Sequence, residues 1–269
     1  MELSWLIGLF VFILGLVWGS FLNVVIYRTV KGSSPFDGRS KCPHCGKLID
    51  WWQNIPLLSF VLLRGKCFKC KKKISLQYPL VEFLSGVLFL WWWLIGRAFF
   101  VLGGSPWQII QPGFWLVVGM LLLVVAIADL IYGVIPDIIN LILFTVVLVY
   151  RLALLNAGEM QMVDWWKSVA VAGGITVFFA FLRWVTKGKG FGMGDVKLAP
   201  SLGLILGWPR GVVGVMAGFI IGAVVGLVLM ALGKKKFGQT LPFGPFLVIG
   251  VVIALWWGGS MWQWYWQMM

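Results

Sequence analysis

Two aspartates in apolar surroundings are the residues best suited to chemistry in this sequence. Asp129 ends an uninterrupted apolar run, and Asp195 lies in the stretch GFGMGDVK at 190–197, between two apolar segments. A carboxylate at the edge of a membrane helix is costly and indicates a functional role. Two carboxylates held close together cannot both ionise easily, so the pair would share one proton. One would act as general base on a water and the other as general acid, the chemistry of an aspartic peptidase.

Each aspartate also has a structural interpretation. Either one could cap a helix or pair with a nearby cation such as Lys197. Asp137 follows a proline and precedes an apolar helix, so it fits the role of an N-terminal cap better and is a second-choice acid.

Alternating glycines precede Asp195, at 188, 190, 192 and 194. Glycine lets the backbone adopt a positive φ and lets another chain approach closely. Gly192 and Gly194, with Lys197, are therefore predicted to form the loop beside which an extended substrate lies. The same freedom predicts a loop that brings Asp195 into reach of Asp129 only when substrate binds.

The four cysteines form two Cys-x-x-Cys pairs, Cys42 with Cys45 and Cys67 with Cys70, separated by 21 residues. Four thiolates at such a spacing predict a closed, tetrahedral site for structural Zn²⁺. A redox pair or an iron site remains an alternative. The one histidine, His44, lies inside the first pair and is expected to be a bystander, so a Ser-His-Asp system has almost no candidate base.

The composition is that of an all-α polytopic membrane protein. Of the 269 residues, 61% are hydrophobic and the mean hydropathy is +0.95, well above the values of soluble domains. The net charge is +13, from 22 basic and 9 acidic residues. Because the basic residues are confined to a few loops, this charge favours membrane topology and contact with anionic lipid in the bilayer, and not nucleic acid.

About eight transmembrane helices are expected, with a small cytoplasmic zinc-ribbon-like insertion between the first two. The segment at 196–208 is the least secure, because it is short and contains Pro200. The expected domains are a first transmembrane helix at 1–28, a cysteine-rich domain at 29–77 and a membrane-embedded aspartic peptidase domain at 78–269. The apolar segments lie at 4–27, 79–102, 112–131, 138–156, 166–186, 196–208, 211–232 and 243–258.

The basic residues also predict the orientation. Placing the N-terminus outside assigns most of them to the inner side, as the positive-inside rule requires. Asp129 then lies near the inner end of the third segment, and Asp195 lies in the inner loop before the sixth. Both acids are thus expected at the cytoplasmic face, and the cysteines are expected in a reducing compartment that disfavours disulfides.

Two further polar groups interrupt the apolar segments. Gly19, Ser20 and Asn23 share one face of the first segment, where small and amide side chains suit tight helix packing. Glu82 lies near the inner end of the second segment, where it would pair with Arg28 or a lysine, or line the site. The late loop at 241–246 (LPFGPF) is expected to be a rigid turn that opens the last helix.

Together these segments resemble the type IV prepilin peptidases, a family of GxGD membrane aspartic proteases. The matching stretches cover nearly the whole chain and occur in the family's order: GSFLNVVIYR, the two cysteine pairs, YPLVEFLSG, the Asp129 segment ending in IPD, GMGDVKL and LPFGPF. GxGD alone is a weaker signal, because presenilin-like proteases share it.

The resemblance implies a bacterial inner-membrane enzyme that cleaves the short basic leader of prepilins or pseudopilins, after a glycine, at the cytoplasmic face. It implies that Asp129 and Asp195 are the catalytic pair. Members with the cysteine-bearing domain usually also N-methylate the new N-terminal residue, often Phe, using S-adenosylmethionine. This chain keeps all four cysteines, so the resemblance implies the second activity too, although no residue can be assigned to the methyl donor.

Two other functions remain open from the sequence. A presenilin-like intramembrane protease would share the acid pair but would not need the zinc site. A proton-coupled transporter with a zinc-stabilised cap would use the acids differently, but transporters place their sites near the bilayer midplane rather than at one face.

Overall fold

The computed structural model of the chain describes residues 2–36, 38–96, 106–188, 190–236 and 239–268. The described part is helical, with two isolated β-bridges and no named strand. It divides into two compact units, Met1–Ile127 and Ala128–Met269. These packing units differ from the functional division expected from the sequence, which stays a prediction.

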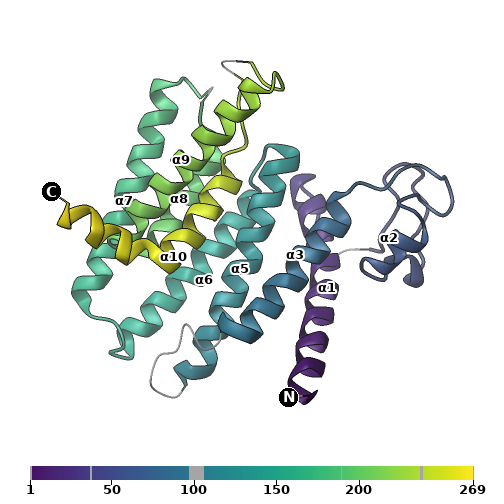
Figure 1. Cartoon of the computed structure of the whole chain (residues 1–269), viewed down its shortest axis with the longest axis horizontal. Coiled ribbons are helices and arrows are strands. Elements are labelled where there is room, and N and C mark those ends of the chain that lie inside the picture. Colours follow the sequence, from purple (N-terminus) through teal and green to yellow (C-terminus); the bar gives the residue numbers. More distant parts are fainter. Residues whose placement is uncertain (1, 37, 97–105, 189, 237–238, 269) are drawn as a thin grey trace. The chain divides into compact units, whose positions relative to one another are not determined.

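The N-terminal unit is built on three long helices and a cysteine-rich insertion (Figure 1). Its elements, in chain order, are α1 (Glu2–Val30), η1 (Trp51–Asn54), α2 (Leu58–Leu62), α3 (Gln77–Trp91), the π-turn η2 (Trp92–Gly96) and most of α5 (Trp107–Tyr132). The insertion between α1 and α3 carries the four cysteines.

Glycines allow α1 and α3 to pack backbone against backbone. A Cβ placed on Gly15 would lie 2.7 Å from the Cα of Gly86, and one on Gly19 would lie 2.6 Å from the Cα of Glu82. Small residues at a helix interface permit this close approach in membrane proteins. The expected role of Gly19 in tight packing is thus confirmed by the geometry.

The C-terminal unit contains the last turn of α5 and five further helices: α6 (Asp137–Asn156), α7 (Met162–Val185), α8 (Met193–Leu206), α9 (Arg210–Ala231) and α10 (Gly244–Gln267). Figure 1 shows α8 surrounded by the other helices of this unit, and α8 contacts α6, α7, α9 and α10. Nearly every residue of α8 after its first turn is buried.

Two contacts with neighbouring helices hold α8 in position along its axis. Its Gly203 packs directly on the backbone of Ala172 in α7, which leaves no room for a side chain. At its C-terminal end, the Arg151 guanidinium of α6 donates to the carbonyl oxygens of Leu204 at 2.8 Å and Ile205 at 3.0 Å. These carbonyls belong to the last turn, where a helix has no partners of its own. The helix that carries Asp195 is therefore held at both its middle and its end.

In the described part, seven helices are long and apolar enough to cross a membrane. They are α1 from Ser4, α3 with η2, α5, α6, α7, α9 and α10. The eighth expected segment is also helical, but α8 has only 14 residues and is not one of the seven. The end of the second expected segment, 97–102, lies outside the described residues.

Candidate active site

Asp129 lies in the last turn of α5, where its side chain is only 7% exposed. The backbone N–H of Gly244, the first residue of α10, donates to its Oδ2 at 2.7 Å. The contact is close: a Cβ placed on Gly244 would lie 2.9 Å from that oxygen. Because α5 ends just beyond, at a Gly133 with φ of 64°, the carboxylate is held at a helix end by a backbone donor far along the chain.

Asp195 lies in the first turn of α8 and is 6% exposed. Its Oδ2 accepts the backbone N–H of Gly192, the N-cap residue, at 3.2 Å. This is the acidic half of a capping box, which satisfies one of the unpaired amides at a helix start. The other carboxylate oxygen, Oδ1, is buried and has no hydrogen-bond partner. One oxygen of the carboxyl group therefore has hydrogen-bonding capacity that no described residue uses.

The two carboxyl groups are close enough to interact electrostatically. Burial and, to a smaller extent, the charge of Asp129 together raise the pKa of Asp195 to about 6, against the lowering effect of the Gly192 hydrogen bond. Both effects disfavour a second negative charge at the site. No hydrogen bond joins the two carboxylates in the described part of the chain.

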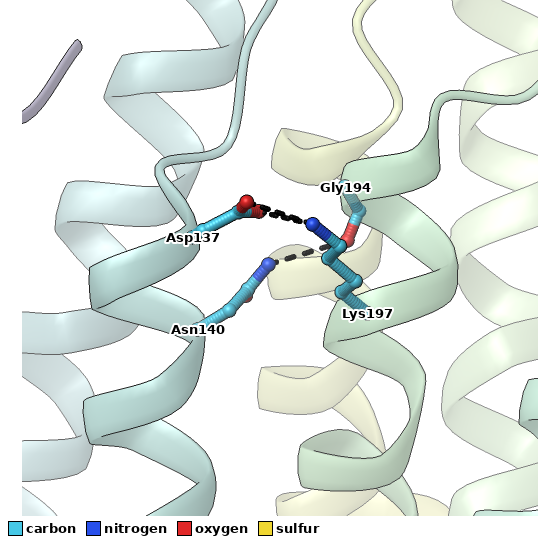
Figure 2. A network of polar contacts seen from close by, with 4 residues as sticks. All are labelled: Asp137, Asn140, Gly194 and Lys197. Atoms are coloured by element: carbon cyan, nitrogen blue, oxygen red, sulfur yellow. Dashed lines mark hydrogen bonds and ion pairs between the residues drawn. The ribbon is translucent and has the colours of Figure 1, made fainter. Parts of the chain in front are cut away.

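Two contacts from α6 hold the start of α8, as Figure 2 shows. The ammonium of Lys197 binds both carboxylate oxygens of Asp137, at 2.7 and 2.8 Å. The side-chain amide of Asn140 donates to the carbonyl of Gly194 at 3.4 Å. The residues on either side of Asp195 are thus tied to the first two turns of α6.

Four phenylalanines join the segments that bear the two acids. Phe179 of α7, Phe191 of the glycine loop, Phe219 of α9 and Phe243 before α10 lie in mutual contact, with all six pairs of ring centroids 4.8 to 6.2 Å apart. We call these four residues the aromatic cluster. Phe191 precedes the N-cap of α8, and Phe243 precedes Gly244, so the cluster connects the loop next to Asp195 with the donor to Asp129.

The four cysteines form a second candidate site, in the N-terminal unit. The sulfur atoms of Cys42, Cys45, Cys67 and Cys70 all lie within 4.8 Å of one another, and none forms a disulfide. Each pair sits in a tight turn closed by a backbone bond, from Cys42 N–H to the Lys47 carbonyl and from Cys67 N–H to the Lys72 carbonyl. Tetrahedral Zn²⁺ with bonds of about 2.3 Å separates its sulfur ligands by about 3.8 Å. The 4.0 Å between Cys42 and Cys70 fits this geometry.

Comparison of the sequence with known proteins identifies the family to which the chain belongs. Residues 116–227 match the type IV leader peptidase family, and residues 13–95 match the bacterial peptidase A24 N-terminal domain. A prepilin leader peptidase/N-methyltransferase of Stutzerimonas stutzeri is 33% identical over 91% of this chain and 89% of its own length. The chain is a member of the type IV leader peptidase family.

Further relatives of this leader peptidase carry the same name. The protein of Legionella pneumophila is 32% identical over 97% of the chain and 95% of its own length, and that of Pseudomonas aeruginosa is 32% identical over 95% and 92%. No solved structure matches the chain. The family consists of membrane aspartic peptidases, so the chain is a multi-pass enzyme of the bacterial inner membrane.

The geometry differs in two respects from what the sequence suggested. Gly192 and Gly194 do not adopt positive φ, whereas Gly188 does, at 74°. Gly194 instead allows close approach, since a Cβ there would lie 3.0 Å from the Cβ of Ile135. Asp137 caps nothing with its side chain, because it pairs with Lys197.

Asp195 was expected in a glycine loop that leaves the acid pair loose without substrate. Its place in α8 differs from that expectation, and the looseness of the pair stays a prediction. Asp195 already belongs to a helix and is capped by Gly192, although the two acids are not hydrogen-bonded to each other. Sequence reasoning also missed the Gly244 amide as a partner of Asp129. The pair Gly244-Pro245 at the start of α10 was the signal for this bond. The first amides of a helix have no partner within the helix, so the N–H of Gly244 can bind an acceptor from elsewhere in the chain.

We expect about one Zn²⁺ per chain in this leader peptidase, because four thiolates close a tetrahedral site. Metal analysis of protein purified without chelator would measure it. Serine at Cys42 or Cys67 should abolish binding, whereas His44→Ala should retain it, since His44 is outside the cluster of ligand atoms. Zinc-free protein, or a disulfide in freshly prepared protein, would contradict the expectation.

The raised pKa of Asp195 makes stability depend on pH. The folded state holds this proton to about pH 6, above the ordinary value of 3.8, so its contribution to stability falls as the pH rises between these values. About 2 pKa units correspond to about 3 kcal/mol. Asp195→Asn removes the ionisation, so the variant should melt at a higher temperature than the wild type at pH 8 and gain little at pH 4.5.

Thermal melting of detergent-solubilised protein at the two pH values measures this difference. Asp164→Asn is the control, because Asp164 is exposed and paired with Lys167 at the surface. An equal effect of Asp195→Asn at both pH values would show that the carboxyl group of Asp195 does not titrate in this window.

Proposed function

We propose that this leader peptidase removes the short basic leader of prepilins or pseudopilins, after a glycine, by a two-aspartate mechanism at Asp129 and Asp195. The observation that carries this proposal is the meeting of two buried carboxyl groups from α5 and α8, one of which has an unpartnered oxygen. Two such groups share a proton and can act as base and acid in one step.

In this mechanism Asp195 holds the shared proton, because burial and the neighbouring charge raise its pKa to about 6. Asp129, which accepts the Gly244 amide, removes a proton from a water as that water attacks the scissile carbonyl. Asp195 gives its proton to the carbonyl oxygen as the tetrahedral intermediate forms. As the intermediate collapses, Asp129 gives the proton it took from water to the leaving amine, and Asp195 takes a proton back from a hydroxyl group of the intermediate, which becomes the new carboxyl group. The pair titrates as a unit, so the two roles belong to the pair with one proton bound.

Gly192, Gly194 and Lys197 form the edge of the site on which the substrate backbone lies. Gly192 is exposed and Gly194 is half-buried, and neither presents a side chain to an approaching chain. The side chain of Lys197 remains 43% exposed although its ammonium is paired with Asp137. The domain division that goes with this proposal has the first helix at 1–28, the metal module at 29–77 and the peptidase part at 78–269.

The basic loops support an orientation with the N-terminus outside and the acid pair at the cytoplasmic face. In that orientation the cysteine insertion is cytoplasmic and its thiols stay reduced. The four cysteines would hold Zn²⁺, which supplies a structural cross-link to an insertion that has little core of its own. Cys45 is less buried than Cys42, so its reaction with a membrane-impermeant thiol reagent in metal-free protein only after the inner face is opened would support this orientation.

Methylation of the new N-terminal residue is the second part of the proposal. Its support is the name shared by the relatives and the retention of all four cysteines. S-adenosylmethionine, the donor that the resemblance implies, is a substrate of this step and not a resident group. A presenilin-like specificity and a proton-coupled transporter, the other classes left open by the sequence, have no counterpart in the relatives' names.

Incubation of purified protein with a prepilin, with and without S-adenosylmethionine, tests both activities. Mass analysis of the product should find cleavage after a glycine in both samples. A mass increase of one methyl group should appear only with the donor. Intact prepilin after incubation would overturn the peptidase assignment, and a cleaved but unmodified product would overturn the methyltransferase assignment alone.

A further inference from the structure

A buried carboxylate in the N-terminal unit has no role in the peptidase mechanism. Glu82 lies in α3, inside a candidate membrane span, and is 8% exposed. It accepts the backbone N–H of Leu57 at 2.8 Å and the hydroxyl of Ser20, and among the described residues no cation pairs with it. An ionised side chain within a membrane span is costly, and such residues mark substrate or ion sites.

Neighbouring side chains add two oxygens that can accept hydrogen bonds, an amide oxygen and a hydroxyl. Asn23 of α1 is 2% exposed, and its amide nitrogen donates to the carbonyls of Gly19 and Tyr78. That leaves its Oδ1 buried without a partner. Ser85, one turn after Glu82, is fully buried and its hydroxyl is also unpartnered. Unsatisfied buried polar atoms cost free energy, so a group of them indicates a missing partner.

These atoms belong to one place in the fold. Gly19 packs on the Cα of Glu82 and against Ser85, and Asn23, one turn along α1 from Gly19, bonds the carbonyl one turn before Glu82. The cluster therefore lies where α1 and α3 touch, and the Leu57 N–H of the cysteine insertion bonds to it. We call Glu82, Asn23 and Ser85 the acceptor cluster.

The chemistry of the acceptor cluster fits an ammonium group. A primary ammonium has three N–H donors and no acceptor, and the cluster offers one negative charge and three oxygens with unused capacity. A divalent cation would fit less well, since Mg²⁺ and Ca²⁺ take six or more oxygens, usually with several carboxylates or waters. Lysine side chains of this chain do not reach the cluster, because Glu82 forms no ion pair with any described residue.

We propose that the acceptor cluster binds the α-ammonium group of the processed substrate chain, the amine that is methylated. This inference rests on the methyltransferase part of the proposed function. It adds the residues that hold the acceptor of the methyl group and places them in a different unit from the acid pair.

The substrate ammonium must lose a proton before methyl transfer, and Glu82 can accept that proton. The ammonium gives a proton to the carboxylate of Glu82, which frees the nitrogen lone pair. The lone pair attacks the methyl carbon of the sulfonium donor, and the carbon–sulfur bond breaks with its electrons going to sulfur. The product is a methylated ammonium and a neutral thioether, and Glu82 returns its proton to solvent.

The affinities of the protein for two synthetic peptides test the inference without relying on enzymatic activity. Both begin with phenylalanine, and one has its N-terminal amine acetylated. The wild type should prefer the free-amine peptide by at least about tenfold, as expected for a buried charge pair. Glu82→Gln should remove this preference while still accepting the Leu57 amide, and should cleave prepilin at the wild-type rate without methylating the product.

Two controls distinguish binding from structure. Glu159→Gln, in an exposed position, should leave both preference and methylation unchanged. Glu82→Asp keeps the charge and should retain more of the preference than Glu82→Gln. An unaltered preference in Glu82→Gln would overturn the inference. Equal losses in the Asp and Gln variants would also overturn it, since they would assign Glu82 to anchoring the cysteine insertion. The activity of the wild type tests the proposed function separately: absence of cleavage or methylation by the wild type would contradict that function, whatever the peptide affinities are.

Discussion

Asparagine in place of either Asp129 or Asp195 should abolish prepilin cleavage while the protein still inserts and accumulates. Each carboxyl group has a distinct task with the shared proton, and an amide can neither take nor give that proton. General acid–base catalysis contributes up to about 10⁴-fold, so we expect a loss of at least about 1,000-fold in either variant. The amide oxygen can still accept the backbone N–H of Gly244 or Gly192, so the local fold should persist.

Cleavage of a prepilin by equal amounts of purified variant, followed over time by gel and mass analysis, measures this loss. Asp137→Asn is the matched control. It removes the exposed contact with Lys197, which is worth at most about 1 kcal/mol, and leaves both proposed catalytic groups in place. Substantial activity in Asp129→Asn or Asp195→Asn would remove that residue from the pair, and a dead Asp137→Asn would move the first acid to Asp137.

The second large effect is expected from a single methyl group at Gly244. In Gly244→Ala the new Cβ would lie 2.9 Å from Oδ2 of Asp129 and 3.1 Å from its Cβ, so the carboxylate or the start of α10 must move. A displacement of about 1 Å in a catalytic group can cost about 100-fold in rate. We therefore expect a loss of about 100-fold in cleavage rate, with a small change in melting temperature.

Gly259→Ala, on the same helix, is the control for that variant. Nothing lies within 4 Å of a Cβ at Gly259, and alanine is a better helix former than glycine, so this variant should be fully active. Wild-type cleavage by Gly244→Ala would show that the donor to Asp129 is not needed in that position.

Sequence reasoning reached the helices and the choice of chemical groups because both follow from local signals. Uninterrupted apolar runs predict spans, and a carboxylate at the end of such a run is conspicuous. Paired cysteines with short spacing predict a cluster of thiols, which the structure has. The 14-residue length of α8 was signalled by Pro200 and by the short apolar run.

The partners of the acids could not be read from the sequence, because they depend on contacts between distant segments. The Gly244 amide reaches Asp129 across 115 positions, and Lys197 reaches Asp137 across 60. Glycine adds a second difficulty, since the residue signals either freedom or close packing. Gly194 and Gly244 serve close approach here, and only the packed structure distinguishes that use from flexibility.

The aromatic cluster bears on how the active site of this enzyme opens. Phe191 precedes the N-cap residue of α8, and Phe243 precedes the donor to Asp129. Their rings meet edge to face with centroids 5.2 Å apart, and both rings have Phe179 and Phe219 as neighbours. Segments that share buried contacts open as one cooperative unit. Amide hydrogen exchange at 190–195 and at 243–246 should therefore proceed at matching rates, and Phe219→Ala should accelerate both segments together.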